Sequence, residues 1–335
     1  MSTLYIPSDP FGRFKAVYDA LIQTKSWMTG APSLRFAAMT ALTCPGDPGQ
    51  VAHQIRSMAD DIKEKSGWFG QLNSPLRFII SAMLVMQKDD AGSFLGEVER
   101  VRQMFRDQKL RRGGIYETMA ILILRMQGNR APVEQQAITR FQAIYEEMKK
   151  FHWWLTGPDD FPACAILVGQ PGAPEAIGTG IERIYRALNA QGFAAGDPLQ
   201  TAANLLFLAG KPADVIATRF RDLARGFKDK KVAIWQSDYD ELAILTFLDQ
   251  PVHVIIHRVL ECRRGMEGLR PKPDGSVTFN LASGVTFLEL AAKGRRGTGV
   301  TGAKALMDMQ AVINAQQAAA AAACSAAAAG AAASG

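Results

Sequence analysis

A large apolar residue followed four places later by a small one recurs seven times in this chain of 335 residues. The first members of successive pairs are separated by 44, 38, 45, 38, 40 and 40 residues. Residues four apart lie on one face of a helix, and the small one lets another helix approach closely. A period near 40 therefore predicts an all-α fold of stacked antiparallel helix pairs, an α/α superhelix or solenoid. The seven pairs, called anchors below, are Leu34/Ala38, Phe78/Ala82, Tyr116/Ala120, Phe161/Ala165, Leu199/Ala203, Tyr239/Ala243 and Phe279/Ser283.

A longer match indicates that the helices between the anchors also repeat. The segment RFKAVYDALIQTKSWMTG starts at Arg13, and RFQAIYEEMKKFHWWLTG starts 127 residues later at Arg140. We therefore expect each anchored helix to pair with the helix that follows it. The first helix of the chain and the anchored helix 279–292 are then left unpaired. We expect one helical repeat domain over 1–292 and a Gly-rich linker with an Ala-rich low-complexity tail over 293–335.

Composition narrows the class of protein. Hydrophobic residues make up 48% of the chain, enough for a continuous core, and the net charge is +6. From Arg219 to Lys304 there are 15 Lys and Arg against 10 Asp and Glu, so this third permits an anionic partner. The four cysteines are far apart, which argues against a disulfide framework and favours a reducing compartment. We expect no signal peptide, no membrane span and a cytoplasmic location.

Two motifs in the centre of the chain resemble a known family. HWWLTGPDD (152–160) and GFAAGDPLQ (192–200), followed by an apolar helix, are similar to the bacterial domain-of-unknown-function family 4003. The resemblance covers roughly residues 1 to 315 and implies an all-helical protein with no assigned activity, substrate or cofactor. The family pattern carries a Ser and a His in the helix after LQ, whereas this chain has Ala203 and Asn204 nearby.

Four acidic residues, Asp159, Asp160, Asp197 and Asp238, come just before anchored helices. Carboxylates there cap free N–H groups and face the positive end of the helix dipole, which is the favoured interpretation. The same positions could also form one rim, with Trp153 beside it, that contacts a protein or peptide. This predicted contact rim comprises Trp153, Thr156, Asp159, Asp160, Asp197 and Gln200.

Basic residues accumulate between residues 219 and 264. They could form a stripe that contacts phosphates, although a solvated helix face is favoured because Asp222 and Asp229 interrupt the run. The predicted basic patch comprises Arg219, Arg221, Arg225, Lys228, Lys230, Lys231, Arg263 and Arg264.

Signatures of catalysis are weak. His253, His257 and Glu261 lie on one helical face, but the spacing favours a polar face over a metal site. The GxGxxG match at 297–302 follows a helical run, so we interpret it as a linker and expect no cofactor. The favoured hypothesis is a non-catalytic helical-repeat interaction or scaffold protein that binds an unknown protein or peptide. A nucleic-acid-binding repeat protein is the alternative, and a hydrolase with a metal at Asp159/Asp160 is a third.

Overall fold

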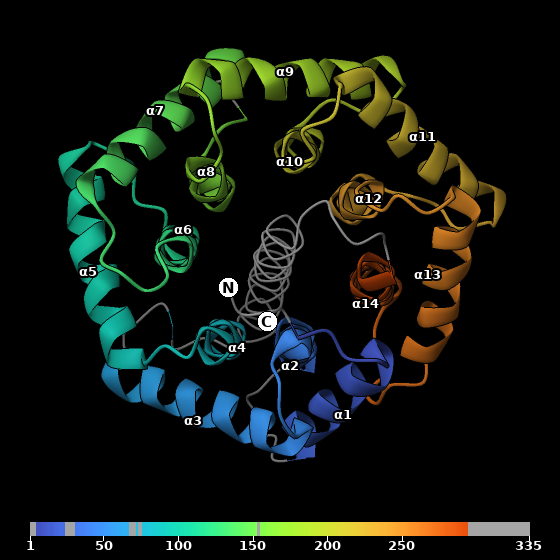
Figure 1. The fold of residues 1–335 in the computed structure, drawn as a ribbon, viewed down its shortest axis with the longest axis horizontal. Helices are drawn as coiled ribbons and strands as arrows, with labels where there is room; N and C mark the ends of the chain where they lie inside the picture. Colours follow the sequence, from blue (N-terminus) through green and yellow to red (C-terminus); the bar gives the residue numbers. More distant parts are fainter. Residues whose placement is uncertain (1–4, 24–30, 67–71, 73–75, 153–154, 294–335) are drawn as a thin grey trace, which may run out of the picture. The chain divides into compact units, whose positions relative to one another are not determined.

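The fold is all-α, as predicted. A computed structural model describes residues 5–23, 31–66, 72, 76–152 and 155–293. Within these ranges the chain forms fourteen α-helices and short 3-10 turns, and no strand (Figure 1). Trp153, Trp154, Cys324 and the segment after Lys293, including the predicted linker and tail, lie outside the described residues.

Backbone contacts divide the chain into two compact units, one over residues 1–96 and one that begins at Glu97. In the first unit α1 packs against α2, and α3 packs against α4. The prediction of a single domain over 1–292 is not tested by this division. The helices of the first unit are α1 (Pro10–Gln23), α2 (Ala31–Thr40), α3 (Pro48–Ser66), α4 (Arg77–Gln87) and the start of α5 (Ala91–Asp107).

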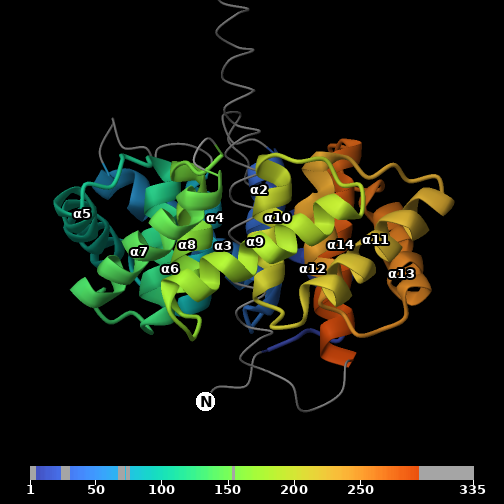
Figure 2. The ribbon, with the colours of Figure 1, turned by 90° about the horizontal axis from the view of Figure 1, so that it is seen from above.

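The second unit consists of two layers of helices. In Figure 1, α6, α8, α10, α12 and α14 are seen end-on, whereas α7, α9, α11 and α13 lie across them. Figure 2 shows α9 passing across α10, against which it packs. The bounds are α6 (Ile115–Gln127), α7 (Gln135–His152), α8 (Phe161–Val168), α9 (Pro174–Ala190), α10 (Asp197–Phe207), α11 (Ala213–Asp229), α12 (Tyr239–Thr246), α13 (Val252–Met266) and α14 (Gly275–Lys293).

Neighbouring helices pack in pairs, but the partners differ from those expected. Six anchored helices pack on the helix before them: α1 with α2, α3 with α4, α7 with α8, α9 with α10, α11 with α12, and α13 with α14; α6 packs on α8. The helices expected to be unpaired, α1 and α14, therefore both have partners. The connections fit this change of partner. Pro212 and Pro251 have extended backbones just before α11 and α13, so the chain leaves the preceding anchored helix instead of folding back along it. The partners cross instead of running side by side.

The anchors lie in the core. All seven belong to the even-numbered helices, and their side chains are buried except that of Tyr116, which is half-buried. Close approach is also required at Gly178 of α9, where a Cβ would lie 2.9 Å from the Cβ of Glu147 on α7. Helix α14 begins at Gly275, earlier than predicted, because the Asp274 carboxylate accepts a hydrogen bond from the Val277 N–H at 2.8 Å.

Arginines of the crossing helices cap the anchored helices. Arg140 of α7 donates to the carbonyl oxygens of Val168 (3.0 Å), Gln170 (2.7 Å) and Gly172 (2.8 Å), at and beyond the end of α8. These carbonyls have no partner within the helix, so a cation there satisfies them and faces the negative end of the helix dipole.

The same contact recurs at the end of α12. Arg219 of α11 donates to the carbonyls of Thr246 (3.1 Å), Leu248 and Gln250 (2.7 Å). In the first unit, Arg13 of α1 donates to the carbonyls of Cys44 and Gly46. Each of these arginines is followed by a fully buried phenylalanine, Phe14, Phe141 or Phe220.

We predict that Arg219→Met lowers the free energy of unfolding by about 2–3 kcal/mol, because the end of α12 loses its charged donor. The matched control is Arg183→Met on α9, an exposed arginine with no ion pair in the described part of the chain. It should change stability by less than about 0.5 kcal/mol. Urea denaturation measures both variants. Equal effects would contradict the capping role.

Candidate functional site

A buried polar cluster joins the start of α8 to α10. Asp160 accepts a hydrogen bond from the Gly157 N–H at 3.1 Å, and its other oxygen lies 3.5 Å from the Asn204 amide nitrogen. The Gln200 amide donates to the Thr156 hydroxyl at 3.1 Å. All four side chains of this cluster, Thr156, Asp160, Gln200 and Asn204, are buried. The contacts bring together positions 44 residues apart in the sequence and hold α10 against α8.

The carboxyl group of Asp160 is uncharged near neutral pH. Burial raises the pKa of Asp160 to about 8, and the neighbouring carboxylate of Asp159 acts in the same direction. Desolvation, and to a smaller extent Asp197, also raises the pKa of Asp159.

The structure separates the predicted contact rim into two sets. Thr156, Asp160 and Gln200 lie in the interior, whereas Asp159 and Asp197 are exposed. The sixth member, Trp153, lies outside the described residues. The rim remains an untested prediction, and a partner approaching it would meet Asp159 and Asp197.

Asp160 and Asp238 cap backbone N–H groups, but these N–H groups come before the acid in the sequence and not after it, as the capping interpretation expected. The carboxylates of Asp160 and Asp238 accept from the N–H three residues earlier, Gly157 at 3.1 Å and Trp235 at 2.8 Å. Both contacts form the returning half of a capping box, in which the third residue of the helical turn binds the backbone before it. Both side chains are buried, so their conformation is fixed by the fold.

A small cavity adjoins the polar cluster. Its volume is about 10 Å³, the space of about one water molecule. Next to Gln200 and Asn204 it is lined by His152 and Glu182, which pair at 2.8 Å, and by Tyr185. A cavity of this size excludes any organic substrate, so we assign the cluster a structural role.

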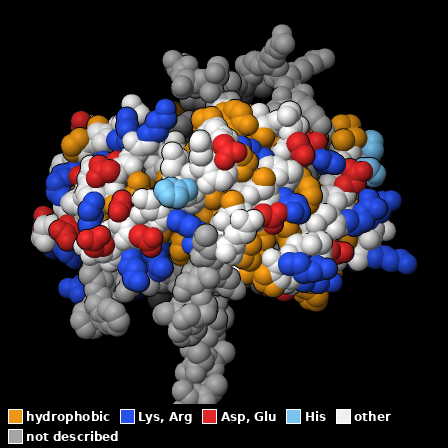
Figure 3. Space-filling view, turned by 90° about the horizontal axis from the view of Figure 1, so that it is seen from below, with side chains coloured by type: hydrophobic (Ala, Val, Ile, Leu, Met, Phe, Trp, Pro, Cys, Tyr) orange, Lys and Arg blue, Asp and Glu red, His pale blue; other side chains and the backbone are white. Residues whose placement is uncertain are grey.

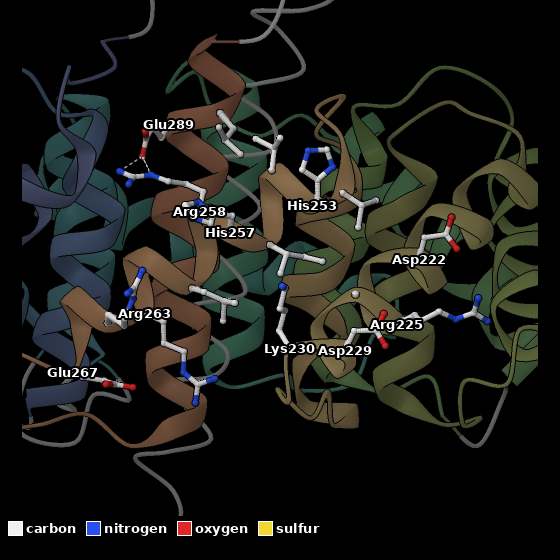
Figure 4. A pocket seen from close by; sticks show the side chains of 17 residues that line it. Asp222, Arg225, Asp229, Lys230, His253, His257, Arg258, Arg263, Glu267 and Glu289 are labelled. Carbon is white, nitrogen blue, oxygen red and sulfur yellow. Dashed lines mark hydrogen bonds and ion pairs between the residues drawn. The ribbon is translucent and has the colours of Figure 1, made fainter.

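A large, open groove lies between α11 and α13. Its volume is about 1490 Å³, and α14 contributes Glu289 and Leu290 at one end. The two crossing helices meet closely at its base, where a Cβ on Gly226 would lie 2.3 Å from Ile256. Figure 4 shows side chains from both helices facing this space. The apolar lining residues are Val252, Val254, Ile256, Leu260 and Leu290.

Both walls of the groove carry cations without a carboxylate partner. Arg225 and Lys230 come from α11 and its end, and Arg263 and Arg264 come from α13; none forms an ion pair within the described residues. Arg258, in contrast, pairs with Glu289 at 2.7 Å (Figure 4) and with Glu261 at 3.0 Å. Arg263 acts electrostatically on Asp238, and Arg264 on Glu261, so only part of this positive charge is left for an anionic partner.

The residues of the predicted basic patch lie in different surroundings, and the patch itself stays a prediction. Arg219 caps α12, and Arg221 pairs with Asp222 at 2.8 Å and donates to Gln191 at 2.9 Å. Lys228 and Lys231 are exposed but do not line the groove. On the face shown in Figure 3, charges of both signs are intermixed. The half of the patch that converges is Arg225, Lys230, Arg263 and Arg264.

The histidines of α13 form a polar face, as favoured from the sequence. His253 and His257 are exposed, and His257 lies 3.6 Å from Glu261. No group of three or more His, Cys, Asp or Glu in the described residues is arranged to hold a metal ion. The sequence did not indicate the groove floor, because Val254 lies in the mostly apolar stretch 252–260 and only the structure shows that its side chain is 36% exposed.

The fold and the groove define an all-α protein of packed, crossing helix pairs with one large open surface. The chain belongs to the family described as "Protein of unknown function (DUF4003)", whose model matches residues 13–318. It is 26% identical over 197 residues to the uncharacterized protein YeaA of Bacillus subtilis (strain 168). The match covers 57% of this chain and 58% of that relative, so the chain spans just over half of YeaA. No solved structure matches the chain. None of the described helices is long and apolar enough to cross a membrane.

We predict that Asp160→Asn flattens the pH dependence of stability. Below about pH 4 the carboxyl group is protonated in both states, and between pH 4 and 8 the unfolded chain loses a proton that the folded protein keeps. As the pH rises from 4 to 8, this group should therefore lower the free energy of unfolding of the wild type by up to roughly 5 kcal/mol. Above pH 8 it should lower it no further.

Urea denaturation at a series of pH values measures this difference. Asp214→Asn, a change at an exposed acid in the first turn of α11, is the control and should keep the wild-type slope. If Asp160→Asn and the wild type show parallel pH profiles, Asp160 is ionised in the folded protein.

Proposed function

We propose that the chain is a non-catalytic interaction protein that holds a segment of another protein in the groove between α11 and α13. The observation that carries this proposal is the size and openness of the groove. At about 1490 Å³ it exceeds the roughly 300–1,000 Å³ of pockets that enclose small molecules. Its apolar floor between two helices resembles the grooves that receive peptides.

The alternative partner is a nucleic acid. The four cations of the groove favour this second candidate, because phosphates would pair with them. Single-stranded nucleic acids, however, bind on aromatic side chains, and the groove lining contains no Phe, Tyr or Trp. We therefore favour a protein segment.

We predict that a photo-crosslinking amino acid at position 254 forms an adduct with another protein in a lysate of the source organism. Val254 lines the groove and is exposed, so the substitution should not disturb the core. The matched control is position 215 on α11, where Val215 is 50% exposed but does not line the groove. Mass spectrometry identifies the adducts.

The proposal requires a protein adduct that is specific to position 254. Equal adducts at positions 254 and 215, or none at 254, would contradict it. Nuclease-sensitive adducts at 254 would replace it with the nucleic-acid alternative. A position at the exposed Asp197 tests the predicted contact rim in the same experiment.

A further inference from the structure

The shape of the groove restricts the form of its occupant. One wall is a stripe along a single face of α13, with His253, His257, Leu260, Arg264 and Glu267 at spacings of four, three, four and three residues. Helix α13 has 15 residues and is therefore about 22 Å long. A second helix laid along this wall would need about 15 residues, or four turns, to fill it.

The chemistry of the lining restricts the occupant further. The floor is apolar from Val252 to Leu260 and continues to Leu290 on α14. An occupant must present an apolar stripe to this floor, because a polar one would leave its groups without hydrogen bonds. In a helix such a stripe has the spacing i, i+3/i+4, i+7.

The charged residues of the groove indicate which net charge its occupant should carry. Within the lining, Arg258 and Glu289 neutralise each other. The other charged lining residues are four cations, Arg225, Lys230, Arg263 and Arg264, and three carboxylates, Asp222, Asp229 and Glu267, of which Asp222 pairs with Arg221 outside the groove. His253 and His257 add positive charge when protonated. The groove is therefore complementary to a negatively charged segment.

We propose that the occupant is an amphipathic helix of about 15 residues in a partner protein, with an apolar stripe on the groove floor and Asp or Glu on its flanks. This inference rests on the proposed function. It adds the secondary structure, length and charge of the bound segment. The positions of Arg225 on α11 and of Arg263 on α13 place acidic side chains on both flanks of that helix (Figure 4).

The test is a display library of random 15-residue peptides selected for binding to the full chain. The enriched sequences should carry apolar residues at helical spacing and a net negative charge. Arg225→Glu should weaken the binding of a selected peptide about tenfold, since one attraction becomes a repulsion. Val254→Asp should weaken it at least as much, because it places a charge on the apolar floor.

The matched control is Lys228→Glu, which makes the same charge change at an exposed position of α11 outside the groove. It should weaken peptide binding clearly less than Arg225→Glu, because Lys228 does not line the groove and makes no direct contact with an occupant. Circular dichroism of the three variants shows that they are folded.

The outcomes separate the two proposals. Peptides that are basic or lack helical spacing, yet lose binding with Val254→Asp, would overturn the acidic helix and leave the groove as the contact surface. Equal losses with Arg225→Glu and Lys228→Glu would also overturn it, because the attraction would then be general. No enriched peptide, or binding unaffected by Val254→Asp, would overturn both proposals.

Discussion

The contact between an arginine of a crossing helix and the last carbonyls of an anchored helix organises the second unit. Arg140 fastens α7 to the end of α8, and Arg219 fastens α11 to the end of α12. Each guanidinium serves several carbonyls that the helix itself leaves without donors. Helix α11 also lines the groove through Asp222, Arg225 and Asp229, so one helix serves both the cap of α12 and the groove.

Spacing predicted the fold class because it follows from local physics. A large and a small residue four apart define a helix face, and each anchor lies on a helix with its small residue in the core. The pattern does not say which neighbouring helix covers that face. The sequence therefore suggested the following helix as the partner, whereas the structure pairs most anchored helices with the preceding one. An Arg-Phe pair marks the capping helices at 13, 140 and 219, but the same pair at 35 and 77 lies on anchored helices, so it could not have fixed the pairing from the sequence.

The candidate site was less predictable because burial depends on the whole fold. Asp159 and Asp160 are adjacent in sequence, yet one is exposed and the other is in the interior with its pKa raised to about 8. Asp160 meets Asn204, a residue 44 positions away, through the packing of α8 and α10. In the basic patch, Arg219 and Arg225 are six residues apart on α11 but serve a backbone cap and an open groove, respectively.

We propose that the protein contacts its partner through the groove between α11 and α13. Hydrogen–deuterium exchange of the full chain, alone and with the protein captured at position 254, tests this claim directly. The account predicts that the partner slows exchange in the segments 222–230 and 252–267, which form the two walls. Slower exchange confined to the segments around Asp159 and Asp197, with unchanged exchange in both walls, would contradict it.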